Sequence, residues 1–368
     1  MRYTDEYRNP DAARGLVATI RGRVAVPIRI MEFCGGHTHA IMRYGIRQAL
    51  SPHLHMLSGP GCPVCVTPDG EIDYAIALAH LPGVTVATFG DMIRVPGSRS
   101  SLQEARAAGA DVRIVYSALD ALEYAQDHPG RSVVMLGIGF ETTAPGVAAS
   151  LVQARELGIE NYFVYSMHKL TPPAMRAILD AGEVRLDGIL GPGHVTTIIG
   201  ARAWSFLAQD YRIPCAVSGF EPLDILRALS MLADAVQNGN PQVANAYPRS
   251  VTSEGNTKAQ LLMKDVFETC SVAWRGLGEI PSSGLKLRQE YAAHDAWLAF
   301  DPPPAAIPTT PTPGERGCRC GEVLRGVVEP PECPLFGRAC TPAWPIGACM
   351  VSAEGSCAAH YRYGGSLD

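Results

Sequence analysis

Short apolar runs alternate with longer amphipathic stretches from about residue 24 to residue 237. A short, continuously apolar run bounded by turn residues is typical of a buried strand, and an apolar position every three or four residues is typical of a helix. Apolar strands separated by helices indicate parallel sheets that are covered on both faces. We predict eight strands, at residues 28–33, 54–57, 84–89, 112–116, 133–138, 162–165, 188–190 and 213–217.

Helical patterns fill most of the intervals between these strands, for example at residues 105–108, 119–126, 147–157 and 173–181. Eight strands could form one large sheet or two smaller ones. We favour an α/β fold with two similar parallel-sheet lobes, at residues 1–117 and 118–237. A weak internal echo accompanies this division, since Gly-Phe-Glu follows one strand at residues 139–141 and another at residues 219–221.

The pattern changes beyond residue 238, where we place a third domain at residues 238–368. Residues 256–270 and 285–297 are predicted to be helices joined by a glycine-containing loop. Residues 301–315 hold six prolines, as expected of a semi-rigid extended connector. The next segment, residues 318–357, carries six cysteines but little regular apolar pattern. We expect a bound metal to cross-link it.

Composition and charge exclude several classes of protein. The chain has 368 residues, of which 47% are apolar and 18% charged, and a net charge of −5. Nothing in this balance attracts phosphate backbones or anionic membranes, so we expect neither nucleic acid nor membrane as a partner. No run approaches the length of a membrane span, and the first residues are polar, unlike a signal peptide. We therefore expect a cytoplasmic protein.

Eleven cysteines in such a protein need an explanation, because cytosolic thiols are kept reduced. Free cysteines often serve as small buried apolar side chains. We give this role to Cys215, inside an apolar run, and to Cys270, late in a helical pattern. The other nine lie in glycine- and proline-rich turns or in the C-terminal cluster, where filling a core does not explain them.

The first candidate site is the turn after the strand at residues 28–33, which holds Cys34, His37 and His39. Ligands of open α/β sheets bind at the carboxyl ends of strands, and the glycines at 35 and 36 allow the backbone to turn closely. A helix starting here would favour a thiolate at Cys34. The histidines would be metal ligands or proton donors. The alternative is a tight turn with a buried thiol and two capping histidines.

The second candidate is the Cys62–Cys65 pair, in a loop held by two glycines and two prolines. Cys-x-x-Cys in a cytosolic α/β protein indicates a redox-active dithiol or half of a metal site, and a zinc half-site is the alternative reading. We predict that the next helix starts at Thr67 and Pro68, which favours a thiolate at Cys65. Because successive parallel strands are often neighbours, Cys34, Cys62 and Cys65 are expected at one rim of a sheet. Three thiols at one rim would be suitable ligands for iron or another soft metal.

These motifs resemble those of the HypD family of hydrogenase maturation proteins. The resemblance covers nearly the whole chain and includes several separate motifs in order. They are Cys-Gly-Gly-His-Thr-His at 34–39, Gly-Pro-Gly-Cys-Pro-Val-Cys at 59–65, Gly-Phe-Glu-Thr-Thr-Ala-Pro at 139–145, Gly-Pro-Gly-His-Val at 191–195, Cys-Pro-Leu-Phe-Gly at 333–337 and Glu-Gly-Ser-Cys at 354–357.

The resemblance implies a scaffold that acts with the small protein HypC to assemble the Fe(CN)2CO unit of [NiFe] hydrogenases. Cyanide would come from HypE, supplied by HypF, and the finished unit would pass to the hydrogenase large-subunit precursor. Cys34 would be the iron ligand shared with HypC, with Cys62 and Cys65 as the nearby dithiol. The family also implies a C-terminal [4Fe-4S] cluster.

Six cysteines are available for the four ligand positions of such a cluster. We choose Cys320, Cys333, Cys340 and Cys357, with Cys318 and Cys349 as substitutes and a zinc site as the chief alternative. Glu141 and His194 follow glycines at strand ends, where they would dock HypE or transfer protons, or simply satisfy the local backbone. No P-loop or dinucleotide fingerprint is present.

Three functions compete on this basis. The leading one is a metal-cofactor assembly scaffold with redox activity, rather than a conventional turnover enzyme. The second is a freestanding iron–sulfur protein that reduces disulfides through Cys62 and Cys65. The third is a zinc-bound structural module attached to a ligand-binding α/β body.

Overall fold

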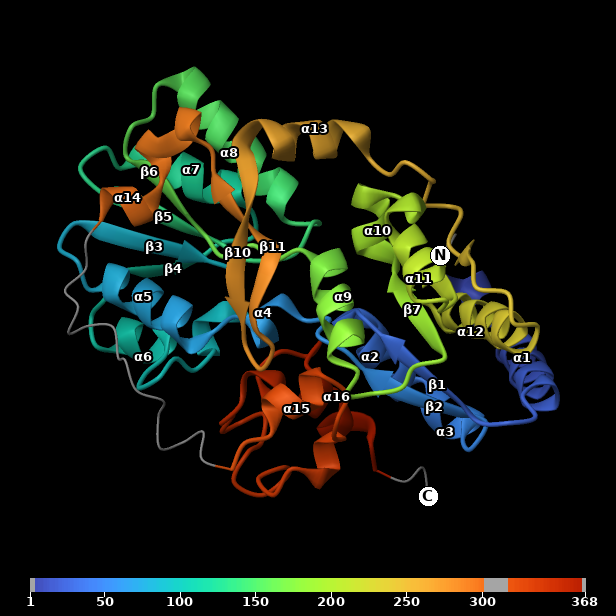
Figure 1. The fold of residues 1–368 in the computed structure, drawn as a ribbon. Coiled ribbons are helices and arrows are strands. Elements are labelled where there is room, and N and C mark those ends of the chain that lie inside the picture. Colours follow the sequence, from blue (N-terminus) through green and yellow to red (C-terminus); the bar gives the residue numbers. More distant parts are fainter. Residues whose placement is uncertain (1–3, 301–316, 366–368) are drawn as a thin grey trace.

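Two parallel β-sheets form the body of the protein in a computed structural model that describes residues 4–300 and 317–365 (Figure 1). Sheet A has the strand order β2-β1-β7-β8-β9 and sheet B the order β4-β3-β5-β6. Every strand pair within them is parallel. The strands of sheet A are β1 (Ile28–Glu32), β2 (Leu54–Ser58), β7 (Gly188–Pro192), β8 (Cys215–Ser218) and β9 (Val243–Asn245), and those of sheet B are β3 (Val84–Thr88), β4 (Val112–Ile114), β5 (Ser132–Gly137) and β6 (Tyr162–Ser166).

All eight predicted strands are present, and the α/β class with two parallel-sheet lobes is confirmed. The additional strand, β9, consists of three half-buried residues and carries no apolar run that could reveal it. The sheets do not follow a division near residue 118. The chain leaves sheet A after β2, builds all of sheet B, and returns to sheet A for β7 to β9. Both sides of that boundary therefore contribute to sheet B.

Helices cover both faces of sheet A, as expected for parallel strands. Neighbouring residues of β1 point to opposite faces, so Ile30 and Met31 belong to different apolar clusters. The cluster around Ile30 includes side chains of α1 (Pro10–Arg23), α2 (Gly35–Arg43), α3 (Ile46–Leu50) and α12 (Pro222–Gln237). The cluster around Met31 includes side chains of α9 (Thr171–Ala181), α10 (Gly193–Ile199) and α11 (Ser205–Asp210).

Sheet B is sandwiched in the same way. Val134 of β5 packs in the cluster that includes α5 (Asp69–Ala79) and α6 (Leu102–Ala107). Its neighbours Val133 and Met135 pack in the cluster that includes α7 (Ala118–Asp127) and α8 (Ala144–Leu157).

A long β-hairpin replaces much of the two helices predicted after residue 238. Helix α13 (Thr257–Val266) is followed by the antiparallel strands β10 (Phe267–Trp274) and β11 (Gly278–Leu287). The prediction of helix for 267–270 and 285–287 was wrong. Residues 268–273 alternate between half-buried and exposed positions, a period of two that suits a strand. Cys270 thus lies half-buried on a strand and not in a helix. The short elements η4 (Gln289–His294) and α14 (Ala296–Ala299) follow.

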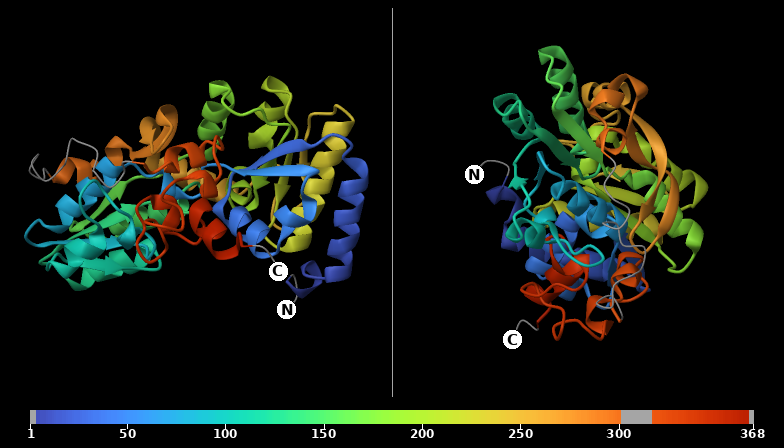
Figure 2. Two further views of the ribbon diagram at one scale, coloured as in Figure 1. Left: turned by 90° about the horizontal axis from the view of Figure 1, so that it is seen from below. Right: turned by 90° about the vertical axis from the view of Figure 1, so that its left-hand side faces the viewer.

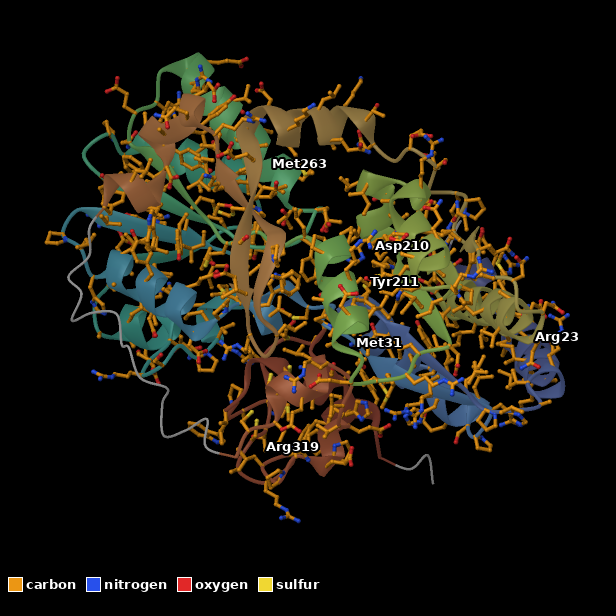
Figure 3. All side chains as sticks on the ribbon, viewed as in Figure 1. Arg23, Met31, Asp210, Tyr211, Met263 and Arg319 are labelled. Atoms are coloured by element: carbon orange, nitrogen blue, oxygen red, sulfur yellow. The ribbon has the colours of Figure 1, made fainter. Side chains whose placement is uncertain are left out.

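The cysteine-rich segment lies where the two lobes meet (Figure 2). It contains α15 (Cys320–Leu324), η7 (Pro330–Glu332), η8 (Ala348–Met350) and α16 (Ser356–Tyr363). Met31, labelled in Figure 3, reaches it from β1: a Cβ placed on Gly326 would lie 2.5 Å from Met31 Cε. The proline-rich connector predicted at 301–315 lies outside the described residues. Among the described residues, no helix combines the length and apolar character that crossing a bilayer requires.

Candidate functional site

Cys34 sits at the carboxyl end of β1, as the residue that caps the start of α2. Its carbonyl accepts from the backbone N–H groups of His37 and Thr38 at 2.9 and 3.1 Å. The dithiol loop passes directly against this turn, because Gly35 N–H donates to Gly61 O at 2.9 Å and a Cβ on Gly61 would collide with the Cys34 backbone. Since β1 pairs with β2 in parallel, the two cysteine turns share one rim of sheet A, as predicted.

Glu32, which the sequence analysis did not identify, stabilises the Cys34 turn with two hydrogen bonds. One carboxyl oxygen accepts from Cys34 N–H at 2.8 Å, and the other accepts from the Thr38 hydroxyl. Burial raises the pKa of Glu32 to about 8, against the lowering effect of these hydrogen bonds. A carboxyl group at position 32, between the apolar residues Met31 and Phe33, was the signal that could have identified it.

His194 is the histidine that reaches Cys34, with its Nδ1 atom 3.4 Å from Cys34 Sγ. It follows β7, which pairs with β1, so both residues leave the same rim of sheet A. Burial lowers the pKa of His194 to about 4, so the ring is neutral near pH 7. A neutral imidazole nitrogen can accept the proton of a thiol.

The expected thiolate at Cys34 is contradicted by its surroundings. Burial, together with the negative charge of Glu354, raises the pKa of Cys34 well above its ordinary value. The backbone N–H groups at the start of α2 lower it, but by less. Cys34 is therefore a thiol at neutral pH unless a cation displaces its proton.

His37 and His39 have other partners. His37 is fully buried, and its Nε2 lies 3.2 and 3.0 Å from the carbonyls of Ser218 and Gly219, at the end of β8. Burial lowers the pKa of His37 to about 4. His39 Nδ1 lies 3.3 Å from Ala353 O, and its ring packs edge-on against Tyr363. These contacts match the structural reading of both histidines.

Cys62 caps the start of the one-turn helix α4 (Pro63–Val66), which contains Cys65, and the two sulfur atoms are 2.7 Å apart. The predicted start of the next helix, with Thr67 as cap and Pro68 as first residue, was wrong by one residue. Thr67 instead closes α4 by donating its hydroxyl to Pro63 O at 2.9 Å, and Pro68 caps α5, which begins at Asp69.

The two thiols of this pair are unequal. Burial raises the pKa of Cys65, but hydrogen bonds with Cys349 and Cys62 and the charge of Arg275 outweigh it, giving a pKa of about 5. Burial and its contact with Cys65 raise the pKa of Cys62. The pKa of Cys65 is thus lowered, as expected, but the neighbouring Cys349 and Cys62 thiols and Arg275 lower it, and not a helix terminus.

The C-terminal cysteines converge on one pocket next to this pair. The pocket is lined by apolar side chains, including Val323, Phe336 and Met350, and by six thiols, those of Cys318, Cys320, Cys333, Cys340, Cys349 and Cys357. Cys320 and Cys349 have sulfur atoms 2.8 Å apart, and Cys65 Sγ lies 3.7 Å from Ala348 O. The predicted clustering is confirmed, and the cluster directly adjoins the dithiol.

The donor set of this pocket suits an iron–sulfur cluster better than a hard metal, because soft thiolates select iron–sulfur clusters, zinc or copper(I). The thiols come from separate turns and are enclosed by apolar side chains. In the described part of the chain, no group of three or more His, Cys, Asp or Glu side chains is arranged to hold a single metal ion.

Glu141 lies in the other lobe, after β5 of sheet B. It is buried, and its carboxylate accepts from the backbone N–H of Thr171 at 2.8 Å and from the hydroxyl of the same residue at 3.0 Å. Burial raises the pKa of Glu141 to about 7. Glu141 thus closes the start of α9, which matches its local-backbone reading.

Glu354 is a second residue that the sequence reading did not assign. It precedes Cys357 in the C-terminal segment, yet its backbone abuts Gly35, next to Cys34. Its charge contributes to the raised pKa of both Cys34 and Cys62. Burial raises the pKa of Glu354 itself to about 6. No local pattern reveals this role, because it depends on the docking of the C-terminal segment against α2.

Comparison with known proteins gives one consistent result. A family model named HypD and described as "Hydrogenase formation hypA family" matches residues 11–364. The chain is 48% identical over 375 residues to the hydrogenase maturation factor HypD of Rhizobium leguminosarum bv. viciae, covering 99% of this chain and 96% of the relative. It is 47% identical over 374 residues to HypD2 of Bradyrhizobium diazoefficiens (99% and 97% covered) and 45% identical over 371 residues to HypD of Escherichia coli (99% and 98% covered).

Proposed function

Because the chain belongs to the HypD family and takes part in hydrogenase maturation, we propose that it is the scaffold on which the Fe(CN)2CO unit of [NiFe] hydrogenases is assembled. The iron unit is its cargo, which passes to the hydrogenase large-subunit precursor. The observation that carries this proposal is the convergence of Cys34, His194 and the Cys62–Cys65 pair at one rim of sheet A.

Cys34 is the proposed iron ligand. A thiolate is a soft donor that suits iron, and a metal can bind only after the thiol has lost its proton. Burial keeps Cys34 protonated, so a nearby acceptor favours metal binding. The neutral ring of His194, 3.4 Å away, is in position to accept that proton. Cys62 and Cys65 would supply further soft ligands or electrons at the same rim.

HypC would share the iron at Cys34, and HypE would deliver the cyanide ligands, with the complex acting in the cytosol. These partners are the ones that the resemblance to the HypD family implies. All three thiols of the rim are at least 97% buried in the isolated chain: Cys34 is 1%, Cys62 3% and Cys65 0% exposed. We therefore expect that docking of a partner opens the rim.

The C-terminal pocket would hold a [4Fe-4S] cluster through Cys320, Cys333, Cys340 and Cys357, with Cys318 and Cys349 as alternative ligands. Such a cluster supplies or accepts single electrons. The proposal is supported by six thiols that line one apolar pocket and by the contact of this pocket with the dithiol.

A second candidate is a freestanding disulfide reductase. It is favoured by one observation, the contact of Cys65 with Cys349 and with Ala348 O, which couples the dithiol to the C-terminal thiols. A reductase would use Cys62 and Cys65 alone and would have no need of Cys34 or His194.

Infrared spectroscopy of the complex with HypC separates these functions, because cyanide and carbonyl stretches absorb where proteins do not. The scaffold reading expects Cys34→Ser to abolish those bands and to stop hydrogenase maturation in cells. The visible absorbance of the C-terminal cluster should persist, because its ligands lie outside this turn.

Cys270→Ser is the matched control, since Cys270 is a half-buried thiol on the hairpin. It should leave the bands, the maturation and the visible spectrum unchanged. Intact cyanide and carbonyl bands in Cys34→Ser would place the iron on another residue and leave the reductase as the better reading.

A further inference from the structure

The β10–β11 hairpin runs from the lobe of sheet B to the junction of the two cysteine groups, and its tip ends beside α4 and α15 (Figure 1). The base of the hairpin packs in that lobe, where Phe267 belongs to the apolar cluster of sheet B. At the other end of β10, next to the tip, Trp274 is buried, stacks on Phe140 and donates its indole N–H to the hydroxyl of Ser283 at 2.8 Å. The Leu170 N–H donates to Ser283 O at 2.8 Å. These contacts fix the hairpin relative to the lobe of sheet B and thereby restrict movement of its tip.

One side of the tip forms hydrogen bonds with the residues that follow Cys65. The backbone N–H of Arg275 donates to Val66 O at 2.7 Å, and its Nε donates to Thr67 O at 2.9 Å. The guanidinium also pairs with the Asp69 carboxylate at the start of α5. Arg275 therefore joins the end of α4 to the beginning of α5 and fixes the segment that carries the dithiol.

The other side of the tip touches the segment that carries Cys320. Gly276, at φ +78°, packs so closely on Gly321 that a Cβ there would collide with the Gly321 backbone. Arg325 of the same segment donates to Gly276 O at 2.5 Å and pairs with Glu183 at 2.6 Å. Only a glycine fits at this crossing without moving α15.

We propose that the hairpin tip, Arg275 and Gly276, is the positioning element that holds the Cys62–Cys65 pair against the C-terminal cysteines and shifts this pair toward its dithiol form. The proposal rests on the redox role of the pair in the proposed function. The Cys62 and Cys65 sulfur atoms lie 2.7 Å apart, whereas a disulfide bond is about 2.05 Å long, so the loop must move for the bond to form. Arg275 opposes that movement because it ties Val66, Thr67 and Asp69 to the hairpin.

The reaction to measure is exchange with glutathione. The thiols of Cys62 and Cys65 give up two protons and two electrons as their disulfide forms, and oxidised glutathione takes them up to become two molecules of reduced glutathione. The anaerobically purified full chain is equilibrated in buffers of graded glutathione ratio and quenched with an alkylating reagent. Mass spectrometry of the peptide with both cysteines then gives the disulfide fraction.

Arg275→Met should raise the equilibrium constant for disulfide formation about fivefold, which is about 20 mV for a two-electron couple. Arg275→Lys, which keeps the charge, should give a smaller change. Lys286→Met is the matched control, because Lys286 is a cation on the same hairpin whose partner is the surface residue Glu268. It should behave as the wild type.

Gly276→Ala tests the second contact against Gly278→Ala. Both glycines have positive φ values, +78° and +77°, so both variants carry similar backbone strain, but a Cβ on Gly278 meets nothing within 4 Å. Gly276→Ala should speed alkylation of the reduced Cys65 at least threefold, because the tip must move off α15, and Gly278→Ala should not.

Circular dichroism and thermal midpoints check that each variant folds. If the wild-type pair cycles while Arg275→Met and Gly276→Ala both match their controls, the tip has no positioning role and the proposed function is untouched. If the wild-type pair never forms a disulfide, the redox part of the proposed function fails together with this inference.

Discussion

The Sγ atom of Cys34 lies 3.4 Å from Nδ1 of His194, although 160 positions separate the two residues in the chain. The contact exists because β1 and β7 are paired neighbours in sheet A, with Glu32 opposite Leu190 in register. Cys34 is buried and His194 is half-buried, and desolvation shifts the pKa of each. It keeps the thiol protonated and the imidazole neutral, so the contact joins two neutral groups and the proton leaves Cys34 only when a metal cation stabilises the thiolate.

Replacing His194 by Ala should therefore weaken iron binding at Cys34. Loss of a partner that orients or deprotonates a metal ligand typically lowers metal affinity by about 10–100-fold. The measurement is the iron content and the iron dissociation constant of the complex with HypC. His128→Gln, at an exposed position after α7, is the control. An unchanged dissociation constant in His194→Ala would reduce His194 to a packing residue.

The cysteine pocket gives a second prediction. The anaerobically purified protein should contain about four irons per chain in a [4Fe-4S] centre, because four thiolates are the usual ligand set. Cys333→Ala and Cys340→Ala should each bleach the visible absorbance and lower the thermal midpoint, since the pocket loses a cross-link. Cys270→Ser should change neither quantity. Full colour in both alanine variants would show that neither cysteine is a ligand.

Sequence patterns were reliable where burial alone decides the structure. The eight apolar strands and the two cysteine turns after β1 and β2 follow from runs that must be buried. What local patterns do not encode is the pairing of distant strands, so the return of the chain to sheet A after β6 was missed. The hairpin was missed for a related reason. Cys270, Val272 and Trp274 belong to a period of two that continues directly from a helical pattern.

The same limit applies to the site. Cys34, Cys62 and Cys65 could be placed at one rim because parallel neighbours end together. Glu354 and Arg275 could not, because they act through the docking of segments that lie more than 200 residues away from the dithiol in the chain. Proximity in sequence also says nothing about which face of α2 His37 and His39 occupy, so a role for them in the chemistry stays a prediction.

Glu32 makes stability depend on pH in a defined direction. Burial raises its pKa to about 8 in the folded protein, above the ordinary value of an unfolded glutamate. Between these values the unfolded chain loses its proton and the folded protein keeps it, so this group's contribution to stability is fully present below about pH 4 and is lost as pH rises toward 8. Glu32→Gln, which stays neutral, should remove that loss.

The measurement for Glu32 is the thermal midpoint of both proteins at pH 5, 6.5 and 8. Relative to the wild type, Glu32→Gln should gain about 1–3 kcal/mol of stability between pH 5 and pH 8. Subtracting the stability of the wild type from that of Glu32→Gln at each pH cancels the contributions of the titrating groups that the two proteins share, including His37 and His194. Parallel curves for the two proteins would mean that Glu32 is ionised in the folded state.

Gly61 joins the two cysteine turns, and a side chain there should separate them. A Cβ on Gly61 would collide with the backbone of Cys34, and the Gly61 carbonyl accepts the N–H of Gly35 at 2.9 Å. Gly61→Ala must therefore push the dithiol loop away from Cys34. Overpacking of this kind typically destabilises a protein by about 1–3 kcal/mol.

Gly70→Ala is the control for Gly61→Ala, since a Cβ on Gly70 has nothing within 4 Å. We expect Gly61→Ala to lower the thermal midpoint and to remove the cyanide and carbonyl bands of the complex with HypC, because the iron site depends on both turns. The Cys62–Cys65 pair should still exchange with glutathione, since Arg275 holds the far end of its loop independently of Cys34. If the bands persist at full intensity while the midpoint falls, Cys34 binds the iron without help from the dithiol loop, and the shared rim is a consequence of the fold and not a requirement of assembly.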